Sequence, residues 1–277
     1  MLFLSHNIHQ GGQSTFDKLT AWVDEQQPDV ITLQEVMANR LRQGVDAFTG
    51  RGYEVTSTFD YDELYGTPRV NAQRGHGLII ASKWPQQPFD TISAGANVQW
   101  PERIHTATLS TPAGAVRLVT THIPNGNGGY KAFKNQSDGG ARLEKKFDTL
   151  EGVHRLITSN LDIPSVLTGD FNEPYAERVD GAYQYWNTDR HCPPLLRQKY
   201  SQRWGAAAAG IFEDLPKLGV RDVHLELHGA NSGATSWLTY RYDRIFASRH
   251  FKPHASGYRR FLDAHMFHAA TYARLDL

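Results

Sequence analysis

Asp170 and Asn172 place a carboxylate and a carboxamide two residues apart, shortly after the apolar run 163–167. Side chains alternate across a β-strand, so both groups would face the same site if the strand continued through them. A carboxylate can orient a water molecule and a carboxamide can donate a hydrogen bond to an oxyanion, which together suit metal-assisted hydrolysis of a phosphate ester. The pattern Gly-Asp-x-Asn also describes an ordinary turn, so by itself it is compatible with both interpretations.

Other apolar runs of the chain also carry polar residues that could do chemistry. These residues are Asn7, Glu35, His122 and Asp243. Strand ends can meet at one edge of a core, where such polar groups would form a single site. This repetition favours the catalytic interpretation of Asp170 and Asn172 over a simple turn.

Six short motifs follow one another along the chain at these positions. They are Asn7, Leu33-Gln34-Glu35, Thr121–Gly126, Gly169–Asn172, Arg241–Phe246 and Asp263-Ala264-His265. In this order they resemble the motifs of the endonuclease/exonuclease/phosphatase superfamily, which includes pancreatic deoxyribonuclease, apurinic endonucleases of the exonuclease III type, sphingomyelinases and inositol polyphosphate 5-phosphatases. The motifs run from residue 7 to residue 265, so the resemblance covers essentially the whole chain.

The resemblance implies a metal-dependent phosphodiesterase and gives the first residues their roles. Glu35 would be the principal ligand of Mg²⁺ or Mn²⁺, because a hard cation that takes few protein carboxylates keeps positions for water and phosphate oxygens. Asn7 would lie beside the metal ion and the phosphate. Asp170 would orient or deprotonate the attacking water, and Asn172 would donate a hydrogen bond to the charge that develops on the phosphorane.

The remaining motifs imply a carboxylate–imidazole pair and contacts to the phosphate. Asp243 and His265 resemble the family pair in which the carboxylate fixes the tautomer of the imidazole and raises its basicity. His122 is similar to the histidine of deoxyribonucleases and sphingomyelinases, whereas Pro124 and Asn125 resemble the apurinic type. We therefore expect His122 and Asn125 near the phosphate without assigning the chain to the repair enzymes. Asn7, Asn125, Arg74 and Arg241 are the expected substrate-binding residues.

Two positions depart from the family pattern. Relatives have Ser-Asp-His where this chain has Asp263-Ala264-His265, so Ala264 stands in place of an aspartate beside the metal, and Asp263 would face the other side of a strand. Some relatives also have an aspartate two residues after the asparagine, where this chain has His9. The interpretation we favour for Ala264 is an active-site substitution that traps substrate, and the alternative is a naturally impaired protein.

Length and periodicity predict one α/β domain over residues 1–277, a four-layer αββα sandwich of two mainly antiparallel sheets flanked by helices. Helical spacing appears after Ser14 and again from about residue 140 to before Asp162, and a hairpin is expected from 104–110 with 115–122. Residues 173–205 lack clear periodicity and suggest a long surface insertion. Its aromatic residues are interpreted mainly as local packing, with base stacking as the alternative.

The charge of the chain does not decide between a nucleic acid and a small phosphorylated headgroup as the substrate. The chain has 29 Lys plus Arg and 29 Asp plus Glu, so its formal net charge is zero. Basic residues concentrate in segments 130–146, 190–203 and 241–260, which are either solvated faces or a groove for a polyphosphate chain. We expect a nuclease that binds nucleic acid. The alternatives are a phosphatase or phospholipase C-like hydrolase acting on a small headgroup, or a catalytically silent binding module.

No feature indicates a membrane, a secretory route or a protein partner. The longest apolar stretches are far shorter than the roughly 20 residues that span a bilayer. A first strand that begins at residue 2 and carries Asn7 is not expected to be a cleaved signal peptide. The single cysteine, Cys192, excludes an internal disulfide framework and a cysteine zinc site. We expect a cytoplasmic monomer.

Overall fold

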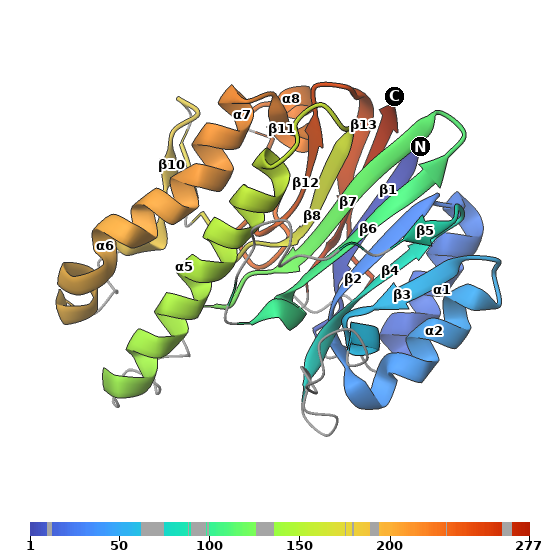
Figure 1. Cartoon of the computed structure of the whole chain (residues 1–277), viewed down its shortest axis with the longest axis horizontal. Helices are drawn as coiled ribbons and strands as arrows, with labels where there is room; N and C mark the ends of the chain where they lie inside the picture. The colour runs from blue at the N-terminus through green and yellow to red at the C-terminus, as the bar shows by residue number, and fades with distance from the viewer. Residues whose placement is uncertain are drawn as a thin grey trace.

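Two β-sheets lie face to face, and helices cover their outer sides (Figure 1). The computed structural model describes the chain except residues 10–12, 62–74, 88, 90–97, 99, 126–135, 175, 179, 189–193, 231 and 262–267. Within the described residues each large sheet has six strands, and most neighbouring strands are antiparallel. The αββα sandwich predicted from the sequence is confirmed.

The first sheet has the strand order β13-β14-β1-β2-β4-β3. Its strands are β1 (Leu2–Asn7), β2 (Val30–Met37), β3 (Glu54–Ser57), β4 (His76–Ser82), β13 (Lys252–Arg259) and β14 (Ala270–Asp276). β1 and β2 are parallel and are connected through α1 (Gln13–Gln26). Phe16, Leu19 and Val23 of α1 recur at helical spacing and are buried in one cluster with Leu4 and Ile31 of the sheet. α2 (Leu41–Thr49) follows the short 3₁₀ turn η1 (Ala38–Arg40).

The second sheet has the strand order β11-β12-β8-β7-β6-β5. Its strands are β5 (Gln86–Gln87), β6 (Ile104–Thr111), β7 (Gly114–His122), β8 (Ser165–Asp170), β11 (Val220–Asp222) and β12 (Asp243–Ser248). β6 and β7 form the predicted hairpin, with Ile104 opposite Thr121. β7 and β8 are parallel, and α5 (Gln136–Thr158) connects them. Each sheet therefore contains one parallel pair joined by a helix.

The shorter elements lie around the two sheets. They are η2 (Thr58–Tyr61), η3 (Pro101–Arg103), β9 (Ala176–Glu177), β10 (Tyr183–Gln184), η4 (Trp186–Thr188), the π-helical turn η5 (Gly210–Asp214), α7 (Leu215–Lys217) and α8 (Val223–His228). No helix among the described residues is long and apolar enough to cross a bilayer.

The side chains between the two sheets change from apolar to polar along the parallel strands. On β1 the alternate residues Phe3 and Ser5 are buried before Asn7, and on β8 Val166 and Thr168 are buried before Asp170. One hydrogen bond between two hydroxyl groups and one from an amide to a hydroxyl group bridge the sheets at the middle of these strands. These bonds are Thr32 to Thr168 at 2.9 Å and Gln34 to Thr120 at 3.0 Å. The period of two thus delivers functional groups from both sheets to one end of the sandwich.

Residues 194–209 form the helix α6, so the predicted surface insertion is wrong for this part of the chain. α6 packs beside α5 (Figure 1), and it buries Tyr200 and Trp204 against Phe147. Its other buried positions are the small residues Ala207 and Ala208, so its apolar periodicity is weak. The burial of Tyr200 and Trp204 agrees with their interpretation as packing residues.

Gly169 allows β8 to approach β7 closely just before Asp170. Its φ is 141°, and a Cβ atom at this position would lie 1.9 Å from the carbonyl oxygen of Thr121. We predict that Gly169→Ala lowers the free energy of unfolding by roughly 2–4 kcal/mol, because it adds both a steric clash and an unfavourable φ.

Gly114→Ala is the matched control for Gly169→Ala, since Gly114 has a φ of 122° and its added Cβ would meet no heavy atom within 4 Å. Denaturant unfolding of both variants separates the clash from the cost of φ. An equal decrease in stability in the two variants would show that the close approach to Thr121 contributes nothing.

Candidate active site

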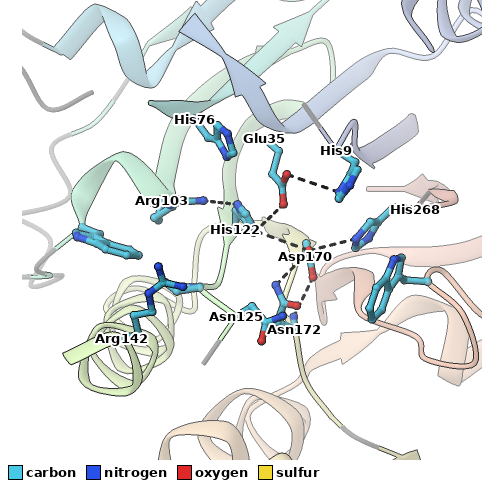
Figure 2. A pocket seen from close by; sticks show the side chains of 13 residues that line it. His9, Glu35, His76, Arg103, His122, Asn125, Arg142, Asp170, Asn172 and His268 are labelled. Carbon is cyan, nitrogen blue, oxygen red and sulfur yellow. Dashed lines mark hydrogen bonds and ion pairs between the residues drawn. The ribbon is translucent and has the colours of Figure 1, made fainter. Parts of the chain in front are cut away.

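A cavity of about 370 Å³ lies at the end of the sandwich where the two parallel pairs present their carboxyl ends. Glu35 comes from the first sheet and Asp170 from the second, and their side chains point toward one another across it (Figure 2). The structure therefore brings together strand ends that are far apart in the sequence.

Asn7 connects the two carboxylates. Its Nδ2 donates hydrogen bonds to Asp170 Oδ2 at 2.8 Å and to Glu35 Oε1 at 3.2 Å. Its Oδ1 accepts a hydrogen bond from the backbone N–H of His9 at 2.9 Å. A single buried carboxamide thus fixes the spacing of two acidic groups that would otherwise repel each other.

Glu35 reaches the cavity through a β-bulge. Strand β2 pairs with β4 up to Leu33, shifts its register, and resumes pairing at Val36. Within this bulge Glu35 has a φ of 56°, a left-handed conformation that is uncommon for a residue with a side chain. In regular alternation Gln34 and Glu35 would face opposite sides of the sheet. The bulge allows both side chains to face the space between the two sheets.

Asp170 and Asn172 form a turn and part of the cavity at the same time. β8 ends at Asp170, and the backbone N–H of Asn172 donates to Asp170 Oδ1 at 2.9 Å, while Asn172 has a φ of 49°. Asn172 Nδ2 donates to Ile123 O at 2.9 Å and to Asp170 Oδ2 at 3.3 Å. The carboxamide of Asn172 therefore holds Asp170 in place, and its donation to a phosphorane stays a prediction.

A buried ion pair between Lys146 and Glu173 holds the backbone at Asn172. Lys146 Nζ donates to the carbonyl oxygen of Asn172 at 3.0 Å and lies 2.8 Å from Glu173 Oε1. Glu173 also accepts from the indole N–H of Trp204 at 2.6 Å and from the backbone N–H of Trp186 at 3.2 Å. Both charged side chains are almost fully buried, so helices α5 and α6 are tied directly to the loop that carries Asn172.

His268 is the imidazole that pairs with Asp243 in the described part of the chain. His268 Nδ1 donates to Asp243 Oδ2 at 2.7 Å, and its Nε2 lies 3.9 Å from Asp170 Oδ2. The predicted partner, His265, lies outside the described residues. Sequence reasoning missed His268, although its position two residues before the last strand, β14, was a usable signal.

His268 is a second candidate for the histidine of the Ser-Asp-His motif, and the interpretation given to Ala264 stays a prediction. That interpretation took His265 as the last residue of the Ser-Asp-His motif. If His268 takes that place, the residue that corresponds to the aspartate is Phe267 and not Ala264. Ala264, like His265, lies outside the described residues.

The pKa values of Asp170 and His268 are both raised, each for a different reason. Burial raises the pKa of Asp170, nearby His268 opposes the rise, and Asp243 adds to it. Burial by itself would lower the pKa of His268, but Asp243 and Asp170 outweigh burial and raise it. At neutral pH His268 is therefore an imidazolium beside a carboxylate with raised basicity, a pair suited to proton transfer.

His122 projects from the end of β7 between the two acidic residues. Its Nε2 lies 3.3 Å from Glu35 Oε1 and 3.8 Å from Asp170 Oδ2, and its Nδ1 is hydrogen-bonded to the guanidinium of Arg103. Burial, followed by the charge of Arg103, lowers the pKa of His122 to about 3. His122 is therefore neutral at physiological pH.

The rim of the cavity carries Trp100, Arg103 and Trp237, which local sequence patterns did not indicate, beside Lys145 from the predicted basic segment 130–146. Arg103 and Lys145 lie over the ring of Trp100, at 5.4 Å and 4.1 Å from its centroid. Trp237 lines the opposite part and stacks on His268 at 6.0 Å between ring centroids. The predicted Asn125 is exposed and also lines the cavity (Figure 2).

Arg241 is not brought to this cavity. Its guanidinium is buried 2.9 Å from Glu177 Oε1 and 2.9 Å from Asp222 Oδ2, and it lines a different cavity. The predicted Arg74 lies outside the described residues. Arg203, from one of the basic segments, is paired with Asp148 at 2.6 Å.

The donors present in the cavity fit a divalent cation. One donor atom from each of Glu35, His122 and Asp170 lies within 4.8 Å of the others. The second such group, Asp170, Asp243 and His268, fits a cation less well, because His268 is an imidazolium held by Asp243. Carboxylate and carboxamide oxygens are the ligands that hard cations such as Mg²⁺ and Mn²⁺ prefer. A cation would also offset the repulsion between Glu35 and Asp170.

The sequence pattern of the Endonuclease/Exonuclease/phosphatase family matches residues 4–265, and the chain therefore belongs to that family. This confirms the family recognised from the six motifs. No curated protein matches the chain in sequence. The family acts on phosphate esters, and this chain has its fold together with a buried cluster of acidic residues and histidines.

Several solved structures have the same fold. An AP endonuclease from Archaeoglobus fulgidus has a TM-score of 0.65 and 18% identity over 100% of both chains. The 3′-5′ exonuclease NExo from Neisseria meningitidis has a TM-score of 0.62 and 18% identity over 100% of both chains. TDP2 from D. rerio, complexed with single strand DNA product, has a TM-score of 0.60 and 16% identity over 100% of this chain and 99% of its own.

The buried Lys146–Glu173 pair leads to a stability prediction. Lys146→Met should lower the free energy of unfolding by about 3–5 kcal/mol, because it leaves the Glu173 carboxylate buried without its partner. The double variant Lys146→Met/Glu173→Gln should be less destabilised than the single one. Denaturant unfolding measures both, with Lys145→Met on the preceding position as the control. A double variant that is as destabilised as Lys146→Met, or more so, would contradict the coupling.

Proposed function

We propose that this protein is a divalent-metal-dependent phosphodiesterase that hydrolyses nucleic acid. The observation that carries the proposal is the joint placement of Glu35, Asp170 and the Asp243–His268 pair around one cavity. The residues combine a metal ligand, a carboxylate of raised pKa and an imidazolium.

The proposed reaction is an attack of water on phosphorus. Glu35 and Asn7 would hold Mg²⁺ or Mn²⁺, which supplies positive charge against the phosphate oxygens. Asp170 accepts a proton from the water while the water oxygen forms its bond to phosphorus. The bond to the leaving oxygen breaks, and His268, held by Asp243, supplies a proton to that oxygen.

The rim of the cavity supports nucleic acid as the substrate. Arg142 and Lys145 offer positive charge for a phosphate backbone, and Trp100 and Trp237 offer aromatic faces for bases. Two structures of the same fold, TDP2 from D. rerio and NExo from Neisseria, were solved with product DNA. Both observations are consistent with a polymer that extends beyond the central cavity.

A small phosphorylated headgroup is the second candidate substrate. A cavity of about 370 Å³ can enclose a single such group, and a formal net charge of zero gives no general attraction for polyanions. The two candidates differ in the number of phosphates that the protein binds, which salt dependence measures.

The metal site gives the first functional prediction. Glu35→Gln should weaken binding of Mg²⁺ and Mn²⁺ and reduce turnover of a chromogenic phosphodiester by orders of magnitude, because it removes the principal charged ligand. Calorimetry measures the metal affinity, and Asp162→Asn on the surface, whose side chain is 93% exposed, is the matched carboxylate-to-amide control. Unchanged affinity in Glu35→Gln would remove Glu35 from the site.

The rim gives the second functional prediction. Replacing Arg142 and Lys145 by glutamine should weaken binding of single-stranded DNA and lower the salt slope by roughly one for each phosphate that the protein no longer neutralises. Arg42→Gln on α2, with a side chain that is 94% exposed, is the control. Binding that does not depend on salt, combined with turnover of a small phosphodiester, would favour the headgroup.

A further inference from the structure

We propose that Ser236 is a positioning residue of the candidate active site, whose two oxygen atoms fix Asp243 and His268 relative to each other. Ser236 directly precedes Trp237, which lines the cavity. This role rests on the proposed function, since it requires the Asp243–His268 pair to act in the reaction. The hydrogen bonds that define the role belong to the folded protein and can be measured without turnover.

The hydroxyl group of Ser236 holds the backbone at Asp243. Its Oγ accepts hydrogen bonds from the backbone N–H groups of Tyr242 at 2.9 Å and of Asp243 at 3.0 Å. A hydroxyl oxygen has two lone pairs, so these two donors use both of them. Strand β11 pairs with residues 246–248 of β12, and Ser236 supplies the acceptor at the beginning of β12. Because Ser236 is fully buried, loss of its hydroxyl group would leave two buried N–H groups without this acceptor.

The carbonyl group of Ser236 holds the chain next to His268. It accepts a hydrogen bond at 2.7 Å from the backbone N–H of Ala269, the residue after His268. Trp237 stacks on the ring of His268 with 6.0 Å between the centroids and 19° between the planes. Asp243 and His268 are 25 residues apart in the chain. Ser236 thus fixes both backbone segments in the geometry in which His268 Nδ1 donates to Asp243 Oδ2 at 2.7 Å.

Further backbone contacts extend this arrangement to Asp170. The carbonyl oxygen of Tyr242 accepts a hydrogen bond from the backbone N–H of Phe171 at 3.0 Å, and Asp243 is opposite Asp170 in the pairing of β12 with β8. His268 Nε2 lies 3.9 Å from Asp170 Oδ2. Since His268 is held by Asp243, a displacement of Asp243 would also change this distance between the two groups that are proposed to transfer protons.

Ser236→Ala tests the positioning role by kinetics. It removes the acceptor of two backbone N–H groups and leaves every side chain that would contact the substrate. Because a misplacement of about 1 Å can cost about 10²-fold in rate, we expect kcat on a chromogenic phosphodiester to fall about 10–100-fold, with KM changed less than about twofold. Ser236→Cys has a similar size and keeps a weaker acceptor, so its kcat should lie between those of Ser236→Ala and the unchanged protein.

Ser248→Ala is the matched control. Ser248 is also buried, it ends the same strand β12, and its Oγ accepts a hydrogen bond from the backbone N–H of Ser165 at 3.0 Å. Denaturant unfolding should show a loss of stability in both alanine variants, whereas kcat of Ser248→Ala should equal that of the unchanged protein. An equal loss of kcat in the two alanine variants, or an unchanged kcat in Ser236→Ala, would overturn the proposal.

Amide hydrogen exchange followed by NMR on the full chain tests the contacts without substrate. Ser236→Ala should speed exchange of the Tyr242 and Asp243 amides at least about tenfold beyond the change in global stability, and Ser248→Ala should not. The Nδ1 proton of His268, hydrogen-bonded to Asp243, should give a downfield signal that broadens in Ser236→Ala only. Unchanged exchange at Asp243 would overturn the proposal. The expected exchange in a protein that hydrolyses no phosphodiester would support these contacts and contradict only the proposed function.

Discussion

Two parallel strand pairs oppose each other across the sandwich, and the functional side chains owe their positions to this arrangement. β1 and β2 in one sheet and β7 and β8 in the other end at the same edge, so alternate side chains from all four strands converge there. Along β8 the inner face changes from Val166 through Thr168 to Asp170, and β1 changes in the same way toward Asn7. The apolar residues such as Val166 hold the two sheets together, and the hydroxyl groups such as that of Thr168 fix their relative position. The polar residues at the strand ends, such as Asp170, form the candidate active site.

Acidic groups from both sheets lie at one edge and repel each other, and the surrounding residues reduce this repulsion. Asn7 donates to Asp170 and Glu35, and His268 is held as a cation by Asp243. Each of these partners is supplied by a different strand or loop. The charge balance of the site therefore depends on correct packing of both sheets, and a divalent cation would complete it.

The fold was largely predictable because its elements have clear periodicity. The hairpin from β6 to β7 and the helices α1 and α5 follow from alternation and from helical spacing in apolar residues. The helix α6 was missed because it buries two aromatic residues and two alanines among polar positions. The few apolar residues of α6 can be recognised as a buried face only once the surface of α5 that covers them is known.

Residue types at strand ends are local information, so the family, the order of its motifs and the candidates Asn7, Glu35, Asp170 and Asp243 could be recognised along the chain itself. Long-range contacts were needed to show that a β-bulge turns Glu35 inward and that Arg103 contacts His122. They were also needed to identify His268 as the imidazole on Asp243 and to place Arg241 in a buried charge network elsewhere. These outcomes depend on register shifts and on the packing of distant segments, which side-chain identity along the chain does not encode.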